Sequence, residues 1–302
     1  MKASTTALLD GMIVLGLPRS GTTLLRRLLD AHPNIACPGE THLLNAVARF
    51  LHKDDLIEGA SMGVLDGLGF AGFHEEEVLE RIREFAFSFS RAQAHRQGKS
   101  RWAEKTALDV FYLDEIEQVF SGQVYQICVF RHGLDVACSN MELAEKNGGY
   151  IDEFHEYIKR HKRPLLAFCH AWVDLTNQLM EFADRHVETT TVYRYEDLVA
   201  EPEETLRQVI EFVDEPWDES ILERAMGSNQ NLGFGDWKTY SKQKIEKSSV
   251  NRWKDLSPAM ISRAGEIINP TLEKLGYDLL PVHGDRESKE ARRRYELGLM
   301  SQ

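Results

Sequence analysis

The sequence predicts an α/β protein with a central, mainly parallel sheet flanked by helices. Two short apolar runs, at residues 12–17 and 124–130, have the continuous hydrophobic character of strands buried on both faces, and a third strand is predicted at 189–193. Helical patterns separate these runs, and that alternation is typical of parallel βαβ units. The run at 12–17 ends at Pro18, before a glycine-containing turn and a helix.

The first predicted helix covers Thr22 to Ala31, where leucines recur at helical spacing. A second helix is predicted over the charged stretch from Phe73 to Gln97. It carries an apolar stripe that we expect to face the core, made of Val78, Ile82, Phe85 and Phe89.

The remaining elements follow in chain order. Helices are predicted over 135–146 and, as the longest of the chain, over 151–185. Pro202 occupies a first-turn position of an amphipathic helix, and a last helix is predicted over Ser257–Lys274. Between these two, the polar, glycine-containing stretch 227–251 predicts a long loop of the kind that often carries function.

Charge and composition narrow the class of protein. The 302 residues include 36 basic and 48 acidic side chains, which gives a formal net charge of −12. A nucleic-acid-binding protein needs a basic excess to displace counterions, so nucleic acid is not expected as a partner. Four cysteines without CxxC or CxxH spacing indicate buried, reduced thiols rather than a disulfide framework.

No run of the sequence approaches the roughly 18 apolar residues of a membrane span, and the N-terminal apolar run has no cleavage pattern. A cytoplasmic protein is therefore expected. Because internal repeats, low-complexity tracts and linkers are absent, we predict one domain over residues 1–302, with its core at 12–275 and a C-terminal tail at 276–302. The sequence leaves the oligomeric state open.

The most informative segment is Gly16–Thr23, between the first strand and the first helix. Its glycines have the spacing of the nucleotide phosphate loop, but Thr22 stands where that loop carries lysine. Glycines let the backbone wrap an anion, and a helix N-terminus directs unpaired N–H groups at it. Arg19 adds a positive charge within the loop, and the loss of the lysine disfavours an ATP or GTP hydrolase.

A second anion-binding element follows the strand at 124–130. Arg131 at the strand end offers a forked donor, and Ser139, eight residues later, offers a hydroxyl from the next helix. Together these side chains can grip a monoester phosphate. A strand-end arginine alone is more typical of a salt bridge. After a phosphate loop, in this order along the chain, it favours a nucleotide site.

These two elements resemble the motifs of the sulfotransferases that use 3′-phosphoadenosine 5′-phosphosulfate (PAPS). The stretch Pro18–Leu24 is similar to their 5′-phosphosulfate loop, and Arg131 with Ser139 is similar to their 3′-phosphate motif. Leu29–Pro33, continuing to Thr41, is similar to the branch that contains the tyrosylprotein sulfotransferases and many bacterial relatives. The resemblance implies a P-loop-containing, sulfotransferase-like fold and a bacterial enzyme that needs no metal.

The resemblance extends over residues 12–275 and adds further site residues. Glu104–Thr106 matches an element whose lysine lies near the sulfate, which here is Lys105. The third predicted strand brings Tyr195, which the resemblance makes a nucleotide contact.

The late stretch Lys247–Trp253 is similar to the family's basic loop over PAPS and implies cofactor contacts from Ser249 and Arg252. Two positions depart from the family pattern. His132–Gly133 replaces the usual Asp-Pro. Leu143 stands where the tyrosylprotein enzymes carry another phosphate-contacting arginine, which weakens transfer of their substrate to this chain.

The resemblance assigns Glu40 as the general base that takes a proton from the acceptor during in-line transfer. His42, a side chain that titrates near neutral pH, is the rival base, and capping of the following helix is the structural alternative for Glu40. Arg19 and Lys105 are expected to neutralise charge on the bridging oxygen. The residues expected to bind the 5′-phosphate are Arg19, Ser20, Gly21, Thr22 and Thr23.

The sequence therefore predicts a PAPS-dependent sulfotransferase that moves a sulfuryl group to a hydroxyl or amine. The alternatives are an atypical P-loop kinase or NTPase and a non-catalytic nucleotide-binding protein. The acceptor stays open among a peptide tyrosine, a lipid, a glycan and a small metabolite. His155, His161 and His170 fall on one predicted helix, but their separations do not give a shared metal-binding face.

Overall fold

The computed structural model describes residues 9–227 and 244–282. These residues form two compact units. The described residues of the first unit lie within Met1–Arg131 and Leu175–Lys247, and those of the second unit lie within His132–Asp174 and Ser248–Gln302. The prediction of a single domain over 1–302 stays a prediction, as does the tail at 276–302, most of which lies outside the described residues.

The first unit is built on a five-stranded sheet with the order β2-β5-β1-β6-β7. Every neighbouring pair of these strands is parallel. The strands are β1 (Gly11–Leu15), β2 (Ile35–Ala36), β5 (Arg101–Glu104), β6 (Tyr125–Phe130) and β7 (Thr190–Arg194). The predicted α/β class with a mainly parallel sheet is confirmed, and the short strands β2 and β5 are additions that hydrophobic runs did not reveal.

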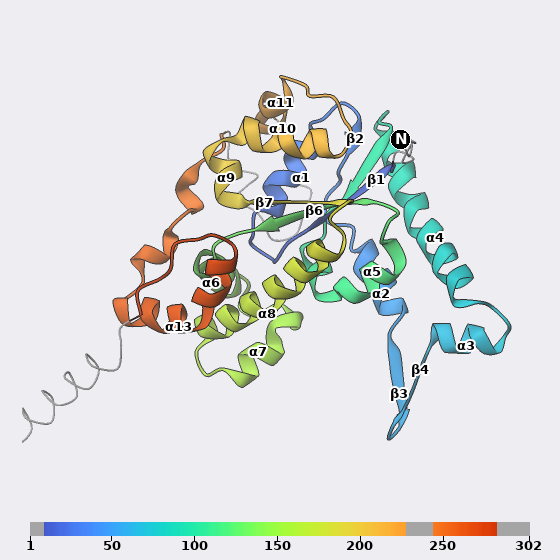
Figure 1. Ribbon diagram of the computed structural model, residues 1–302, viewed down its shortest axis with the longest axis horizontal. Coiled ribbons are helices and arrows are strands. Elements are labelled where there is room, and N and C mark those ends of the chain that lie inside the picture. Colours follow the sequence, from blue (N-terminus) through green and yellow to red (C-terminus); the bar gives the residue numbers. More distant parts are fainter. Residues whose placement is uncertain (1–8, 228–243, 283–302) are drawn as a thin grey trace, which may run out of the picture. The chain divides into compact units, whose positions relative to one another are not determined.

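Helices cover both faces of this sheet (Figure 1). The helices whose residues all lie in the first unit are α1 (Thr22–Asp30), α2 (Leu43–Phe50), α3 (Val64–Phe70), α4 (Glu75–Arg96), α5 (Leu113–Phe120), α9 (Tyr195–Ala200), α10 (Pro202–Phe212) and α11 (Ile221–Gly227). Successive side chains of β5 alternate between the two faces. Arg101 donates to the carbonyl of Val213 just after α10, whereas Trp102 packs on Phe87 of α4.

The helix over 75–96 corrects one sequence prediction. Phe85 and Phe89, which we expected in the core, are 58% and 56% exposed. The buried face of α4 instead includes Phe87, whose ring lies 4.9 Å from Trp102 and 5.7 Å from Phe120, centroid to centroid. Val78 and Ile82, the first half of the predicted stripe, are buried as expected. In the second half, the aromatic partners on β5 and α5 select Phe87 for burial in place of Phe85 and Phe89.

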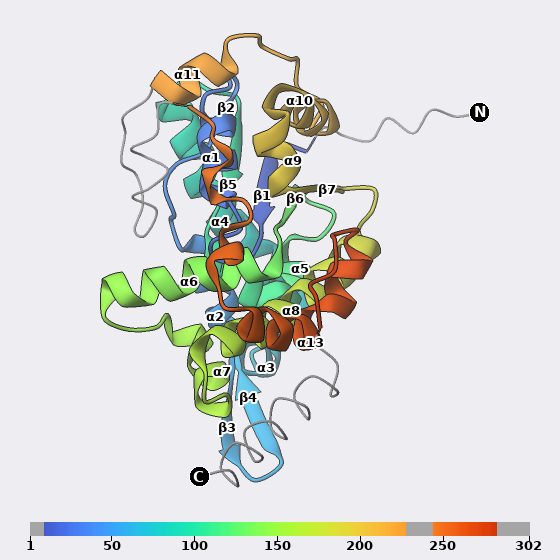
Figure 2. The ribbon, with the colours of Figure 1, turned by 90° about the vertical axis from the view of Figure 1, so that its left-hand side faces the viewer.

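A hairpin of β3 (Lys53–Ile57) and β4 (Ala60–Gly63) leaves the body of the first unit (Figure 2). Its residues are almost all exposed, and Ile57 is 73% exposed. The hairpin was not predicted, because its short strands lack a buried face that would impose an apolar pattern.

The predicted long helix over 151–185 is wrong in its extent. The segment forms a 3-10 turn (Asp152–Phe154), α7 (His155–Arg160) and α8 (Pro164–Arg185), which runs through both units. Pro164 begins α8 because proline fits the first turn of a helix and breaks an interior. His155, His161 and His170 therefore do not share one helix, and the imidazoles of His161 and His170 stack with centroids 3.9 Å apart.

The second unit contains α6 (Gly133–Asn147) and α13 (Pro258–Lys274), with short 3-10 turns at Lys247–Ser249, where the units meet in the sequence, and Arg252–Asp255. Gly133 packs so closely on Trp172 that an added Cβ would lie 2.6 Å from its ring. The predicted long loop at 227–251 falls largely outside the described residues. The predicted helices at 22–31, 135–146, 202 onward and 257–274 are confirmed.

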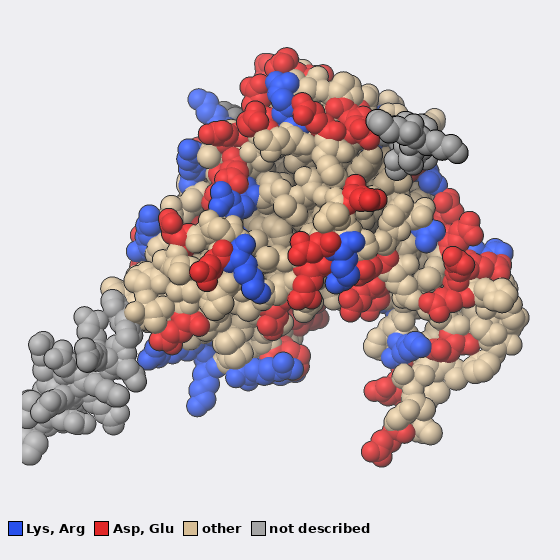
Figure 3. Space-filling model, in the orientation of Figure 1, with Lys and Arg blue, Asp and Glu red and all other residues tan. Residues whose placement is uncertain are grey.

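The four cysteines are free, as predicted, and Cys37, Cys128 and Cys169 are buried. Burial raises the pKa of Cys37 and of Cys169 to about 12, so these thiols are poor nucleophiles. Among the described helices, none is long and apolar enough to cross a membrane. Figure 3 shows acidic side chains gathered over α10 and α11 and on the β3–β4 hairpin, in keeping with the net charge of −12.

Candidate active site

The phosphate-loop segment lies at the carboxyl end of β1 and leads directly into α1. Gly21 has a φ of 96° and Arg19 a φ of 76°, so the turn needs left-handed backbone at two places. A Cβ at Gly16 would lie 2.9 Å from the Thr22 methyl group and 3.0 Å from the Val129 carbonyl oxygen. The glycines at 16 and 21 therefore serve close approach and chain reversal, as the motif predicted.

Tyr195, the first residue of α9, closes over this loop. A Cβ at Gly21 would lie 2.2 Å from the Tyr195 ring, and the guanidinium carbon of Arg131 lies 4.7 Å from the centroid of the same ring. Arg131 also donates from Nη1 to the carbonyl oxygen of Arg19, at 2.5 Å. The ends of β6 and β7 thus bring two predicted site residues, Arg131 and Tyr195, to the phosphate loop that contains Arg19.

The first N–H groups of a helix have no partner inside the helix, and at α1 these groups belong to Thr22 and Thr23. The macrodipole of the helix adds partial positive charge at the same point. Ser20, Thr22 and Thr23 are all at least nine-tenths buried. This N-terminus can therefore hold a phosphate in the first unit, with backbone N–H groups and hydroxyls as donors.

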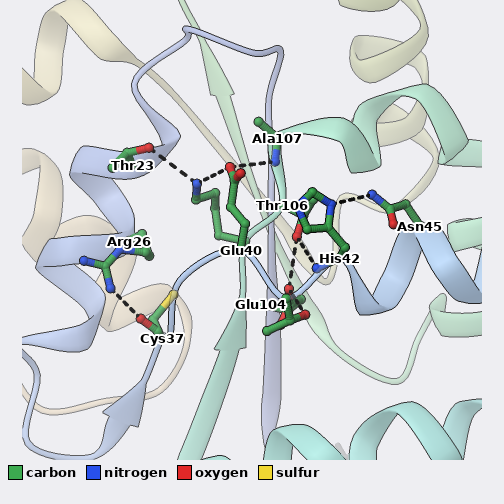
Figure 4. Close-up of polar contacts among 11 residues, drawn as sticks. Thr23, Arg26, Cys37, Glu40, His42, Asn45, Glu104, Thr106 and Ala107 are labelled. Carbon is green, nitrogen blue, oxygen red and sulfur yellow. Dashed lines mark hydrogen bonds and ion pairs between the residues drawn. The ribbon is translucent and has the colours of Figure 1, made fainter. Parts of the chain in front are cut away.

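Lys105, which follows the last residue of β5, connects the phosphate loop to the predicted base. Figure 4 labels its two partners, Thr23 and Glu40. The lysine Nζ lies 2.6 Å from Glu40 Oε1 and 3.4 Å from Thr23 Oγ1. The lysine side chain is 3% exposed and the Glu40 side chain is 16% exposed. A buried ion pair at the N-terminus of α1 is unexpected for a purely structural contact, because desolvation of two charges is costly.

Glu40 also accepts from the backbone N–H of Ala107, at 3.3 Å. It does not cap α2, because the residue at the N-terminal boundary of that helix is His42. The helix-cap alternative for Glu40 is therefore wrong. β2 and β5 are parallel neighbours, so the segments that follow them carry Glu40 and Lys105 to the same edge of the sheet.

His42, the rival base, has a φ of 58° and its side chain is exposed. Its backbone N–H donates to Thr106 Oγ1 at 3.2 Å, and its ring Nδ1 lies 3.3 Å from the Asn45 amide nitrogen. No contact joins the His42 ring to Lys105 or to the phosphate loop within the described chain. The geometry therefore favours Glu40 over His42 as the group nearest the anion site.

A layer of buried acids lies behind this pair and was missed by the sequence analysis. Glu104 is 1% exposed, and its Oε1 accepts from Thr41 Oγ1 at 2.7 Å and from Thr106 Oγ1 at 3.3 Å. Burial raises the pKa of Glu104 to about 7, against the lowering effect of the two threonine hydroxyls. The sequence could have indicated this position. Successive side chains of a strand point to opposite faces, so Glu104 is expected on the face away from Lys105.

Asp109 is fully buried and neither of its carboxylate oxygens has a hydrogen bond of good geometry within the described chain. Burial, with the nearby charges of Glu104 and Glu40, raises the pKa of Asp109 well above its usual range. The attraction of Lys105 acts in the opposite direction. Lys105 is therefore the cation of a cluster that holds three carboxyl groups.

The other predicted cofactor residues lie at or beyond the start of the second unit. Ser139 is a buried residue of α6, Ser249 closes the 3-10 turn Lys247–Ser249, and Arg252 forms an ion pair with Glu142 of α6. The Asp135 carboxylate accepts from the backbone N–H groups of Asn251, at 2.8 Å, and Trp253, at 3.3 Å. Within this unit, two backbone hydrogen bonds therefore hold the segment around Asn251 and Trp253 against α6.

No group of three or more histidine, cysteine, aspartate or glutamate side chains is arranged to hold a metal ion within the described ranges 9–227 and 244–282.

A turn with the glycine spacing of a phosphate loop lies between a central parallel strand and its helix, and an arginine stands at the next strand end. This arrangement is typical of P-loop-type α/β proteins. The sulfotransferase family profile matches residues 12–219, and the chain belongs to that family. Its enzymes transfer sulfuryl groups, so the predicted family, the predicted fold and the enzyme class are confirmed.

Curated relatives include protein-tyrosine sulfotransferase 1 of Danio rerio, 25% identical over 87% of this chain and 71% of the relative. The protein-tyrosine sulfotransferase of Drosophila melanogaster is 26% identical over 87% of this chain. The chain covers only 50% of that second relative's length.

Two solved structures share the fold. The sulfotransferase domain from the Synechococcus olefin synthase superposes with a TM-score of 0.60 at 22% identity, over 89% of this chain and 94% of that domain. The sulfotransferase domain from the curacin biosynthetic pathway superposes with a TM-score of 0.58 at 20% identity, over 89% and 98%.

Proposed function

We propose that the protein transfers a sulfuryl group from PAPS to a hydroxyl or amine of an acceptor, with Glu40 as general base. One observation carries the proposal: the Glu40–Lys105 ion pair lies against Thr23 at the N-terminus of α1. A base and a cation are thus held together at the place where the donor's 5′-phosphosulfate would bind.

In the proposed step the acceptor oxygen attacks sulfur in line, and the bond between sulfur and the bridging oxygen of PAPS breaks. The acceptor's proton passes to a Glu40 carboxylate oxygen, and 3′-phosphoadenosine 5′-phosphate (PAP) leaves with the bonding electron pair. Negative charge grows on the departing phosphate oxygen. The Lys105 ammonium, the Arg19 guanidinium and the N–H groups of Thr22 and Thr23 stabilise that charge.

The remaining residues have binding roles in this proposal. Ser20 and Gly21 complete the 5′-phosphate loop, and Arg131 with Ser139 takes the 3′-phosphate. Tyr195 contacts the nucleotide, and Ser249 and Arg252 supply the late basic loop. The pairing of Arg131 with the Tyr195 ring supports this assignment, because it fixes the guanidinium beside the loop.

The printed names of the relatives supply a peptide tyrosine as one candidate acceptor. Tyrosine sulfation by this chain is a weaker proposal than sulfuryl transfer itself, because Leu143 occupies the position of an expected arginine. A cytoplasmic, bacterial enzyme also stays a prediction.

Binding of PAP to the purified chain, followed by thermal unfolding, tests the donor site. A ligand that binds only the folded state at a hundred times its Kd adds about 2.7 kcal/mol to the free energy of unfolding. We expect PAP to raise the melting temperature, ATP with magnesium to leave it unchanged, and Arg131→Ala to abolish the PAP effect.

The control is Arg81→Gln, which alters an exposed arginine of α4 paired with Glu77. This variant is expected to respond to PAP like the wild type. Stabilisation by ATP with magnesium but not by PAP would overturn the proposal in favour of a kinase. PAP binding without sulfate transfer to any acceptor would favour a non-catalytic nucleotide-binding protein.

A further inference from the structure

A cavity of about 420 Å³ lies on the α4 side of β5, within the first unit. It is lined by residues of segment 38–43, of α4 and of β5. Its volume falls within the usual range for small-molecule sites, which are mostly apolar with a few placed polar groups. The cavity is not part of the phosphate loop, and its lining has no role in the reaction described above.

Two phenylalanines of α4 give this cavity its apolar character. Phe85 and Phe89 line it, and their rings pack edge to face with centroids 5.2 Å apart. Both side chains are more than half exposed, although two partly exposed aromatic rings one turn apart are costly in water. Trp102, which is 2% exposed, forms the third aromatic wall. Three aromatic side chains around one cavity favour an aromatic or other flat apolar guest.

Charged and polar groups lie at the two ends of the cavity. Arg96, in the last turn of α4, makes no ion pair or hydrogen bond with the described residues. Eleven residues separate it from Phe85, which corresponds to about 16 Å along the helix axis. The chain turns back after α4, so Arg96 lies toward the start of β5 and Phe85 toward its end. An unpaired guanidinium at one end favours a carboxylate or another anionic group on the guest.

The opposite end of the cavity is the wall formed by Thr41 and Glu104. Glu104 Oε1 accepts from the two threonine hydroxyls, and the carboxyl group also accepts from the Thr41 backbone N–H. A carboxylate has about four lone-pair sites, so these three donors leave one that favours a hydroxyl or amine donor on the guest. Thr41 directly follows Glu40 in the chain, so this end of the cavity is the end nearer to the candidate base.

We propose that the cavity binds the acceptor, and that the acceptor is an elongated aromatic molecule with a hydroxyl group at one end and an anionic group at the other. The hydroxyl lies at the Thr41–Glu104 wall, the ring system between Phe85, Phe89 and Trp102, and the anionic group at Arg96. The assignment of the guest as acceptor rests on the proposed sulfuryl transfer, whereas the class of guest follows from the cavity itself.

The test measures binding of two probes to the PAP-bound enzyme by calorimetry. The first probe is a hydroxybiphenyl carboxylate with its polar groups at opposite ends, and the second is the same phenol without the carboxylate. Phe89→Ala is expected to weaken both probes about tenfold through lost aromatic contact. Arg96→Gln is expected to weaken only the carboxylate probe, by about three- to fivefold, the usual range for a solvent-facing ion pair.

Two matched variants serve as controls. Phe70→Ala removes an 81% exposed aromatic ring of α3, and Arg81→Gln removes an exposed charge of α4, both outside the cavity lining. Each is expected to bind both probes within about twofold of the wild type. With PAPS present, the carboxylate probe is expected to be sulfated, and Arg96→Gln is expected to raise its KM with kcat unchanged.

Failure of the inference and failure of the proposed function give different results. If PAP binds but neither probe does, or if Phe89→Ala and Arg96→Gln bind like the controls, the inference is overturned and the donor site stands. Sulfation of a tyrosine peptide with no dependence on Phe89 or Arg96 would overturn it as well. If PAP does not bind, the proposed function is overturned. If the probes bind and respond to the two cavity variants but are not sulfated, the cavity is a binding site for this class of guest and its role as the acceptor site is overturned.

Discussion

The Lys105 ammonium lies 2.6 Å from the Glu40 carboxylate and 3.4 Å from the Thr23 hydroxyl. One lysine thus touches both the candidate base and the first turn of α1, the candidate phosphate-binding helix. β5 supplies the lysine and the segment after β2 supplies the glutamate, and these two strands are parallel neighbours. The candidate base and the candidate anion site therefore lie at the same edge of one sheet, where ligands of parallel α/β folds usually bind.

Glu40→Gln tests the assignment of the base. The amide keeps the size of the side chain but cannot accept the acceptor's proton, so we expect sulfate transfer to fall by about a hundredfold to ten-thousandfold. PAP affinity should stay within about twofold. Steady-state kinetics and calorimetry measure the two quantities, and Glu58→Gln on the exposed hairpin is the matched control. Full activity of Glu40→Gln would transfer the base role to His42.

Gly21→Ala tests the backbone requirement of the loop. The new Cβ would lie 2.2 Å from the Tyr195 ring at a φ of 96°, so we expect loss of PAP binding and a free energy of unfolding lower by about 2 kcal/mol or more. Gly98→Ala has a φ of 69° and open space around the new atom. It should lose only about 1 kcal/mol, and PAP binding should be unchanged. Urea unfolding of both variants separates clash from backbone strain.

Tyr195 substitutions test how the loop is closed. Tyr195→Phe keeps a ring over the Arg131 guanidinium, whereas Tyr195→Leu removes it. We expect PAP affinity near the wild-type value for the phenylalanine variant and about three- to tenfold lower for the leucine variant. Titration calorimetry at fixed ionic strength measures the difference. Equal affinities for all three proteins would show that the ring plays no part in holding Arg131.

The raised pKa of Glu104 predicts that the free energy of unfolding depends on pH. Its pKa is raised from 4.5 to about 7 in the folded chain, so the folded state holds a proton that the unfolded state has already released. The free energy of unfolding should therefore fall as the pH rises from about 4.5 to 7, by an amount on the order of a few kcal/mol. Below pH 4.5 the Glu104 carboxyl is protonated in both the folded and the unfolded state. Above pH 7 it is ionised in both states, and the free energy of unfolding falls no further on its account.

Glu104→Gln isolates this effect, because the amide oxygen can still accept from Thr41 and Thr106. We expect the variant to lose part of the decline between pH 4.5 and 7 and to gain stability relative to the wild type at pH 8. Urea unfolding of both proteins at several pH values gives the comparison. Parallel pH profiles would mean that Glu104 is ionised throughout, and Asp109 would then account for the slope.

Local sequence patterns predicted much of the fold and part of the site. β1, the phosphate turn and α1 are consecutive, so the spacing of Gly16 and Gly21 with the leucines of α1 was sufficient to place them. Arg131 and Tyr195 follow strand ends and could be assigned in the same way. The acid cluster could not, because Glu104 and Asp109 become buried only when β5 and the turn after it pack.

The two phenylalanines of α4 mark the limit of reasoning from periodicity. The apolar stripe gave the helix and placed Val78 and Ile82 on its buried side. It did not place the second half of the helix, where Phe87 rather than Phe85 meets Trp102 and Phe120. The hairpin at 53–63 could not be predicted for a related reason. Neither of its faces is buried, so no apolar pattern marks its strands in the sequence.

The sequence by itself determined the class of fold, the phosphate loop and the family, because each depends on residues that are close along the chain. Only the tertiary structure decided that Lys105 pairs with Glu40, that Glu104 is buried behind them and that Phe85 and Phe89 line a cavity. These are contacts between segments tens of residues apart. Their distances follow from strand order and helix packing, which no local pattern encodes.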